Sequence, residues 1–259
     1  MQFIDQMQRT VTLPAVPGRI VSLVPSQTEL LVDLGLRNNL VGITKFCVHP
    51  KNLRKEKTIV GGTKQVHYDR IKALQPDIVL CNKEENTLEM VEALENIAPV
   101  WVSDIISIED CLVMIKAFGK LFQKEKNALS IIKNIEGEWR DFNNFISKKP
   151  FKKVAYLIWK NPYMVAGKDT FINTLLKINH FRNSFSEREE RYPEISENEL
   201  VETELILLST EPYPFKKKDI LMLSKINYTG EVVLVDGEYF SWYGSRLAKA
   251  FRYFKKLQS

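Results

Sequence analysis

Histidine, cysteine and long apolar runs are scarce in this chain. Its 259 residues include only three histidines and three cysteines. Cys47, Cys81 and Cys111 show no CxxC spacing, so we expect free thiols and neither a disulfide framework nor a zinc knuckle. No apolar run reaches the roughly 18 residues of a membrane-spanning helix, so an integral membrane protein is not expected.

The first twenty residues lack the pattern of a secretory signal. They read MQFIDQMQRTVTLPAVPGRI, with an acid at Asp5 and no continuous apolar core. Two alternatives therefore stay open, a cytoplasmic chain or one from which a different start was removed.

Catalytic and nucleic-acid motifs are also missing. His49, His67 and His180 have no HExxH spacing, Ser26 lacks the glycines of a nucleophile elbow, and GGTK at 61–64 is not a phosphate loop. Cys47 and His49 lie two residues apart and could contact a metal, but we expect an ordinary loop histidine. The net charge of +5 is spread among mixed charges, so no nucleic-acid partner is expected.

The first hundred residues alternate apolar strands with short helices. Strand-like runs are RIVSLV (19–24), LVGIT (40–44), DIVLCN (77–82) and PVWVSD (99–104). Ser26 and Glu29 have the spacing of a capping box, and Asp69 falls in the first turn of a short helix. This alternation predicts a mostly parallel sheet flanked by helices.

A long helical region separates this part from a second α/β part. Apolar residues recur every three or four positions after residue 125, namely Ala128, Ile132, Ile135, Trp139, Phe142 and Ile146. Such a stripe fits a bundle helix or a spine between two lobes. After Pro150 the strands and helices resume, and ISENELVETELILLST echoes HYDRIKALQPDIVLCN as a short helix, a turn and a buried strand.

The predicted fold class is therefore α/β, with two Rossmann-like lobes, each a mostly parallel sheet flanked by helices, joined by one long backbone helix. We expect an N-terminal lobe over 1–122, a connecting helix over 123–149 and a C-terminal lobe over 150–259.

Aromatic and basic residues gather in the loops that follow the predicted strands. The segment DGEYFSWYGSRL (236–247) alone carries four rings and an arginine. Ligands of open α/β sheets bind at the carboxyl ends of the strands, and rings in proline-stiffened loops suit a flat or bulky ligand. A ring at such a place can also simply cover the core. The rings are Phe46, Trp159, Tyr163, Tyr213, Phe215, Tyr239, Trp242 and Tyr243, with Lys45, Lys64 and Arg246 among them.

Several of these segments are similar to those of a known protein family. SLVPSQTELLVDLGL, VGITKFCVHP, the WVSD strand, the long helix and DGEYFSWYGSRLAKA resemble the helical-backbone class of ABC-transporter solute-binding proteins, in the branch that binds cobalamin and ferric siderophores. The resemblance covers about residues 19–257. It implies two lobes with a ligand cleft, and one acidic residue on each lobe that docks on the permease.

The resemblance also implies site residues. Thr63 and Asn82 stand where a cobalamin-binding relative has tryptophans, so a corrinoid and a ferric siderophore both stay open as ligands. Lys45, Lys64 and Arg246 favour a ligand with carboxylates or phosphate. Asp69 matches the docking position of the first lobe, and Asn198 that of the second, with Glu197 and Glu199 on either side. The full expected ligand set is Lys45, Phe46, Thr63, Lys64, Asn82, Trp159, Tyr163, Tyr192, Tyr213, Tyr239, Trp242, Tyr243 and Arg246.

The sequence thus predicts a monomeric solute-binding protein of an ABC importer, without catalysis or cofactor, that carries a corrinoid or ferric siderophore to its permease. Family resemblance places it in the periplasm, with the cytoplasm as the alternative. Two other interpretations stay open. One is a chelatase-like enzyme, for which His49 with Glu84 or Glu85 is the available residue set, and the other is a ligand sensor.

Overall fold

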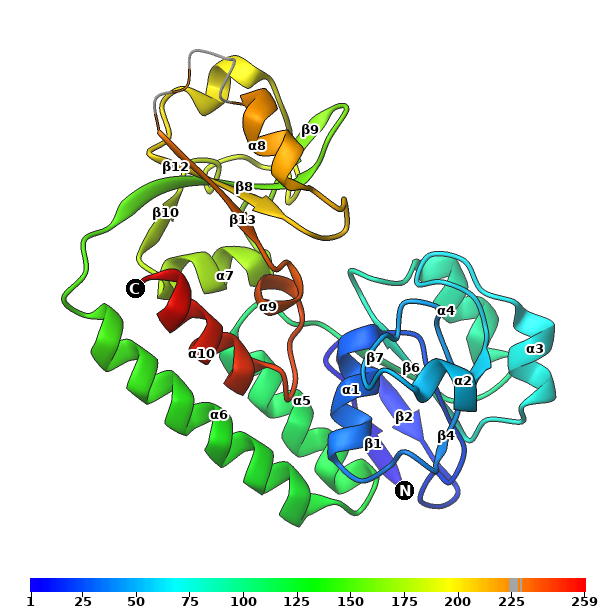
Figure 1. Cartoon of the computed structure of the whole chain (residues 1–259). Helices are drawn as coiled ribbons and strands as arrows, with labels where there is room; N and C mark the ends of the chain where they lie inside the picture. Colours follow the sequence, from blue (N-terminus) through cyan, green and yellow to red (C-terminus); the bar gives the residue numbers. More distant parts are fainter. Residues whose placement is uncertain (224–227, 229) are drawn as a thin grey trace. The chain divides into compact units, whose positions relative to one another are not determined.

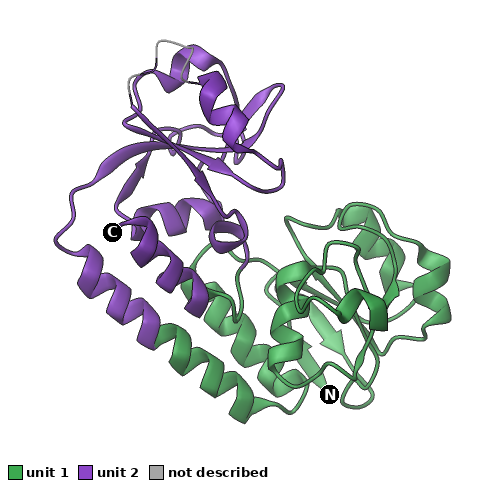
Figure 2. Ribbon diagram, in the orientation of Figure 1, with its two compact units in different colours: residues 1–136, 243–247 green, residues 137–242, 248–259 purple. Residues whose placement is uncertain are grey.

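The computed structural model describes residues 1–223, 228 and 230–259, which form two compact α/β units (Figures 1 and 2). Unit 1 comprises residues 1–136 and 243–247, and unit 2 comprises 137–242 and 248–259. The two-lobed α/β class is as predicted. The division between the units falls within the long helix α6 (Glu125–Ile146), after residue 136.

Unit 1 is built on a five-stranded parallel sheet in the order β5-β4-β3-β6-β7. Four of the strands fall within the runs predicted from the sequence. The strands are β3 (Ile20–Ser22), β4 (Leu40–Ile43), β5 (Thr58–Ile59), β6 (Ile78–Asn82) and β7 (Val100–Ser103). The fifth, β5, is only two residues long, which is too short for an alternating pattern to reveal it.

Helices connect these strands in the βα order that a parallel sheet requires. They are α1 (Pro25–Asp33), α2 (Leu53–Glu56), α3 (Tyr68–Ala73), α4 (Leu88–Glu95) and α5 (Ile108–Leu121). The expected capping box at Ser26 and Glu29 is absent. Helix α1 begins two residues earlier than this box would place it, at Pro25 after the N-cap Val24, because a proline needs no N–H partner in the first turn. A capping box is found instead at Ser107 and Asp110, where α5 begins.

Four of the six predicted stripe residues of α6 are buried, whereas Ile132 and Trp139 are partly buried. Ala128, Ile135, Phe142 and Ile146 are at most 3% exposed. In unit 1, Ala128 lies against Gly119 of α5, where a β-carbon would stand only 2.7 Å from the Ala128 methyl group. In unit 2, Phe142 packs on Phe251, with ring centroids 5.9 Å apart. The spacing of three and four residues places these side chains on one side of α6, where they make both contacts.

Unit 2 holds a six-stranded mixed sheet. Its order is β11-β9-β8-β12-β13, and β10 also pairs with β8. The strands are β8 (Lys152–Trp159), β9 (Tyr163–Val165), β10 (Phe181–Asn183), β11 (Glu194–Ile195), β12 (Leu205–Ser209) and β13 (Glu231–Val235). The neighbours β8, β12 and β13 are parallel, so their carboxyl ends share one edge of the sheet.

The remaining elements of unit 2 are α7 (Phe171–Ile178), the 3₁₀ turn η1 (Glu197–Leu200), α8 (Lys217–Leu223), α9 (Glu238–Ser241) and α10 (Leu247–Leu257). The predicted echo between the two halves is present, since α3 with β6 and η1 with β12 are each a short helical element followed by a buried strand. Among the described residues, every helix is too short or too polar to span a bilayer.

Candidate functional site

A cavity opens in unit 1 at the carboxyl ends of β4 and β5. Its volume is about 500 Å³, within the usual range for small-molecule sites. It contains four of the residues predicted to contact a ligand, together with neighbours that the sequence analysis did not select. The lining residues are Lys45, Phe46, Ile59, Gly61, Gly62, Thr63, Lys64, Gln65 and His67.

The loops around this cavity are fixed by backbone bonds. Lys45 N donates to Gly61 O at 2.8 Å, and Gly62 N donates to Gln65 O at 2.7 Å. Gly61 has a φ of +132°, and a β-carbon there would lie 2.6 Å from Gln65 O. Only glycine fits this turn without strain, so GG at 61–62 shapes the cavity wall even though it is not a phosphate loop.

The cavity combines one exposed ring with positive charge. Phe46 is 48% exposed, and the Lys45 ammonium lies 5.1 Å from the centre of its ring. Lys64 Nζ donates to Glu84 O at 2.5 Å, which holds this second ammonium near the loop that follows β6. His67 is also exposed at the cavity wall. An apolar surface beside two ammonium groups suits a ligand with both a flat apolar part and an acidic group.

Asn82 lies beneath this edge of the sheet, not on its surface. It is 3% exposed, and its amide donates to Ser103 O at 3.1 Å. Its side-chain oxygen accepts from the backbone N–H of Glu84 and Glu85 at 2.9 and 3.2 Å. These bonds order the loop after β6, so the site proposed below does not include Asn82.

Tyr243 and Arg246 are likewise engaged inside unit 1. Tyr243 is 6% exposed and its hydroxyl accepts from Gln27 Nε2 at 3.2 Å, and burial raises the pKa of its phenol. The Arg246 guanidinium, in a side chain 5% exposed, donates to both oxygens of Glu29 at 2.7 and 3.2 Å. Arg246 is already neutralised there, so neither residue is part of the site proposed below.

In unit 2, rings gather after β8 and β12. Trp159 is 41% exposed at the end of β8 and meets Tyr213 edge to face, with ring centroids 5.6 Å apart. Tyr213 in turn lies 4.7 Å from Phe215, which is buried. Tyr163 is partly buried on β9. Trp159, Tyr163 and Tyr213 therefore present a ring surface, while Phe215 supports it from the core.

A lysine and an aspartate fix the loop beside these rings. Lys160 Nζ donates to Asp219 Oδ1 at 2.7 Å, and the side chains are 11% and 3% exposed. The hydrogen bond to Asp219 raises the pKa of Lys160. Because removing one partner of a pair this buried is costly, the pair holds the loop after β8 against α8. This pair could not be predicted from a local pattern, because the two residues lie 59 positions apart.

The crowded segment 236–247 serves several purposes. Phe240 is fully buried against Tyr156 and Phe254, at 5.1 and 4.7 Å between centroids. Tyr239 is partly buried and stacks on Tyr253 at 4.7 Å. Trp242 is 7% exposed. Much of the crowding is therefore core packing, and Tyr239 and Trp242 are the residues of this segment in unit 2 that we retain as candidates for ligand contact.

The remaining predicted positions lie on loops and turns. Tyr192 is partly buried in the segment that leads to β11, and Asp69 is exposed at the start of α3. Glu197 is exposed in η1, whereas Glu199 closes a capping box with Ser196 and pairs with Arg188. These contacts lower the pKa of Glu199 and give its carboxylate a local structural role.

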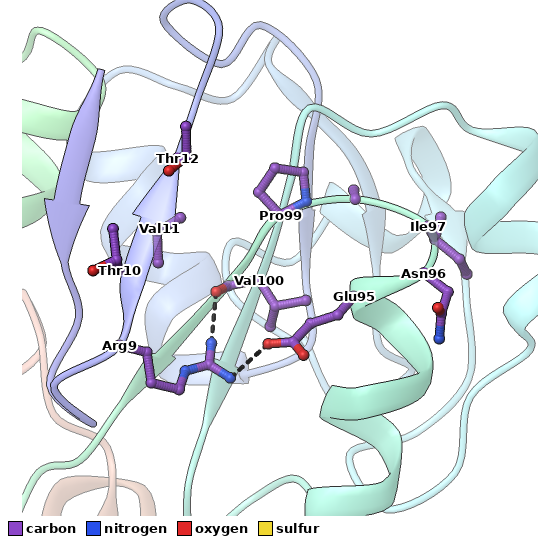
Figure 3. Close-up of a pocket in the computed structure, with 10 residues that line it drawn as sticks. Arg9, Thr10, Val11, Thr12, Glu95, Asn96, Ile97, Pro99 and Val100 are labelled. Carbon is purple, nitrogen blue, oxygen red and sulfur yellow. Dashed lines mark hydrogen bonds and ion pairs between the residues drawn. The ribbon is translucent and has the colours of Figure 1, made fainter.

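A second cavity of about 350 Å³ lies at the other end of unit 1 (Figure 3). It is bounded by Glu95–Val100, which lead into β7, and by the hairpin of β1 (Gln2–Ile4) and β2 (Thr10–Thr12). Arg9 crosses it, donating to Val100 O at 2.7 Å and to Glu95 at 2.9 Å. These bonds join the hairpin to the amino end of β7, away from the edge where ligands of parallel sheets bind.

The three cysteines lie on different elements of unit 1. Cys47, Cys81 and Cys111 are free, as predicted, and all three are buried. Cys47 contacts the hydroxyls of Thr28 and Thr44 at 3.2 and 3.3 Å, and burial raises its pKa. Within the described part of the chain, no group of three or more histidine, cysteine, aspartate or glutamate side chains is placed to hold a metal ion.

Comparison with known proteins shows the family. The model of the periplasmic binding protein family matches residues 20–212, and the chain therefore belongs to this family. The resemblance to solute-binding proteins of ABC transporters is confirmed, and with it the interpretation as a binding protein instead of an enzyme. The chelatase-like alternative is not favoured.

Individual proteins of known name are similar to this chain. The chain is 29% identical over 192 residues to the uncharacterized ABC transporter substrate-binding lipoprotein YvrC of Bacillus subtilis, covering 71% of this chain and 60% of that protein. It is 21% identical over 242 residues to the vitamin B12-binding protein of Pectobacterium atrosepticum, covering 91% of this chain and 86% of that one. The structure of a periplasmic heme binding protein from Pseudomonas aeruginosa shares the fold, with a TM-score of 0.80, 22% identity and coverage of 93% and 92%.

Proposed function

We propose that the protein captures a bulky metal chelate bearing acidic groups, of the corrinoid, haem or ferric siderophore kind, and delivers it to an ABC permease. The cavity at Lys45, Phe46 and Lys64 carries this proposal, because it places a ring and two cations at the ligand-binding edge of a parallel sheet. The rings Trp159, Tyr163 and Tyr213 of unit 2 support it. Relatives named for vitamin B12 and heme binding support the same chemical class.

Transport of such a ligand places the protein outside the cytoplasmic membrane, in the periplasm or held at the membrane surface. The family name and the lipoprotein relative support this location. We further propose that the protein works as a monomer.

The first prediction tests the ligand class. We expect at least one of cyanocobalamin, haemin and a ferric carboxylate siderophore to bind in isothermal titration calorimetry, and Trp159→Ala to weaken that binding about five- to tenfold, since a lost ring contact costs about 1 to 1.4 kcal/mol. Phe151→Ala is the matched control. Phe151 is 50% exposed and stacks on His180 just before the amino end of β8, so its loss should leave affinity unchanged. Failure of every chelate to bind more tightly than about 100 μM would contradict the proposal.

The second prediction concerns docking on the permease. We propose Asp69 on unit 1 and, because the Glu199 carboxylate already pairs with Ser196 and Arg188, Glu197 on unit 2 as the docking acids. Asp69→Arg with Glu197→Arg should lower the association rate with the permease, and the loss should shrink as salt rises, since exposed charges act by long-range steering. Glu199→Gln should mainly lower stability. Surface plasmon resonance on permease in nanodiscs measures the association rate and its dependence on salt. Unchanged association of the folded double variant at low salt would refute the docking role.

A further inference from the structure

Glu211 lies where the chain leaves β12, directly beneath α9 and Trp242. Its carboxylate accepts from Ser241 Oγ at 2.5 Å and from the Trp242 side chain. Its backbone is held as well, since Ser209 Oγ donates to Glu211 O at 2.5 Å. One side chain therefore ties the end of β12 to the last residue of α9 and to the indole that follows it.

The packing around Glu211 leaves little room for another arrangement. A β-carbon on Gly237 would stand 2.6 Å from Glu211 Cγ and 2.3 Å from Ser209 Oγ, so the start of α9 lies directly on this side chain. Gly237 N donates to Thr210 Oγ1 at 3.0 Å, and Thr210 N donates to Val235 O at 3.1 Å. The β12 end, the β13 end and α9 thus meet at Glu211.

The charges that face Glu211 are of its own sign. Asp236 at the end of β13 and Glu238 on α9 both act on it, and the titratable phenol of Tyr156 on β8 faces the same cluster. Burial, and then these two carboxylates, raise the pKa of Glu211 to about 7, against the opposing effect of the Ser241 and Trp242 hydrogen bonds. Asp236 itself caps the turn, accepting from Glu238 N at 3.1 Å.

A proton on Glu211 can be accommodated without losing a hydrogen bond. Ser241 Oγ already lies 2.9 Å from Gly237 O, so its own proton can turn there while the Oγ atom accepts from the carboxyl group. The other carboxyl oxygen stays available to the Trp242 side chain. The ionised form keeps these contacts but places a third negative charge beside Asp236 and Glu238.

We propose that Glu211 is a positioning residue for the ligand site, and that in its protonated form it holds α9 and Trp242 in place, so that ligand is bound more tightly at acid than at alkaline pH. This rests on the proposed function for the ligand. The hold of Glu211 on α9 and Trp242, here called the clamp, is a property of the protein without ligand. Loss of the proton loosens α9 by repulsion from Asp236 and Glu238, and it also adds negative charge near a ligand that carries acidic groups, so both effects have the same sign.

The clamp is tested on the ligand-free protein by tryptophan fluorescence between pH 5 and 9. We expect a transition with a midpoint near the pKa of about 7 in the wild type. Trp242→Phe should remove it, which assigns the signal, and Glu211→Gln should remove it because the amide mimics the protonated acid. Glu189→Gln is the matched control, since Glu189 is exposed on a loop of the same unit. A transition that persists unchanged in Glu211→Gln would overturn the proposal.

The functional half is tested with cyanocobalamin and haemin, each titrated at pH 6 and pH 8. Wild type and Glu189→Gln should bind more weakly at pH 8, by up to about tenfold, which is the limit over this interval for one group with a pKa of about 7 in the free protein. Glu211→Gln should bind equally at both values, and Ser241→Ala should weaken binding at pH 6. Equal pH dependence in wild type and Glu211→Gln would refute the positioning role. If neither chelate binds at any pH, the proposed function fails, and the fluorescence titration still decides the clamp.

Discussion

Replacing Arg246 by alanine is expected to lower the free energy of unfolding by about 3 to 5 kcal/mol, because it removes the cation that donates to both oxygens of the buried Glu29 carboxylate. The two side chains are 5% and 7% exposed and share two hydrogen bonds, at 2.7 and 3.2 Å. Denaturant unfolding measures the loss. Trp101 is the tryptophan of unit 1, where this pair lies, so its fluorescence reports on the affected unit.

Arg252→Ala provides the matched control for this change. Arg252 also donates two hydrogen bonds to one glutamate, Glu138, but its side chain is 61% exposed. An exposed pair contributes about 0 to 1 kcal/mol, so this variant should unfold almost as the wild type does. Arg246→Met with Glu29→Leu should recover much of the loss, since apolar side chains then replace both buried charges. Equal stability of Arg246→Ala and Arg252→Ala would show that the Glu29 pair is not structural.

The strands and the long helix were predictable because their patterns are local. The runs at 19–24, 40–44, 77–82 and 99–104 bury continuous apolar surface, and the α6 stripe repeats every three or four residues. These patterns depend on neighbours in the chain. The start of α1 was predicted wrongly, because local spacing does not show what the rest of the fold buries. Ser26 and Glu29 have the spacing of a capping box, but both are buried by the rest of unit 1.

The role of each site residue was harder to predict, because it depends on partners far away in the sequence. Arg246 and Tyr243 look like ligand contacts in a loop, yet Glu29 and Gln27 lie 217 and 216 residues before them. The chain returns to unit 1 for only residues 243–247, and the local pattern of these residues does not indicate that return. Glu211 and the Lys160–Asp219 pair were missed for the same reason. Phe46 and Trp159 were chosen on a local signal, a ring after a strand, and both rings are exposed.

Aromatic residues in this chain therefore divide by burial into two groups with different expected effects. Trp159, at 41% exposed, has surface to give to a ligand, while Phe142, Phe240, Phe251 and Phe254 are fully buried. Replacement in the first group should change affinity with little change in stability. Replacement in the second should do the reverse, because a cavity remains in a close-packed interior.

Phe142→Ala is the sharpest test of this division. Its ring lies 5.9 Å from both Phe251 and Phe254 of α10, and its loss should lower the free energy of unfolding of unit 2 by about 3 to 5 kcal/mol. Trp139, stacked on Phe251 at 6.4 Å, reports the change in denaturant unfolding. Phe145→Ala is the control one turn away, where the ring is only partly buried, and it should cost about 1 kcal/mol. If the two variants were equally stable, α10 would not be held by the α6 stripe, and the packing of the helix that joins both units would have to be reinterpreted.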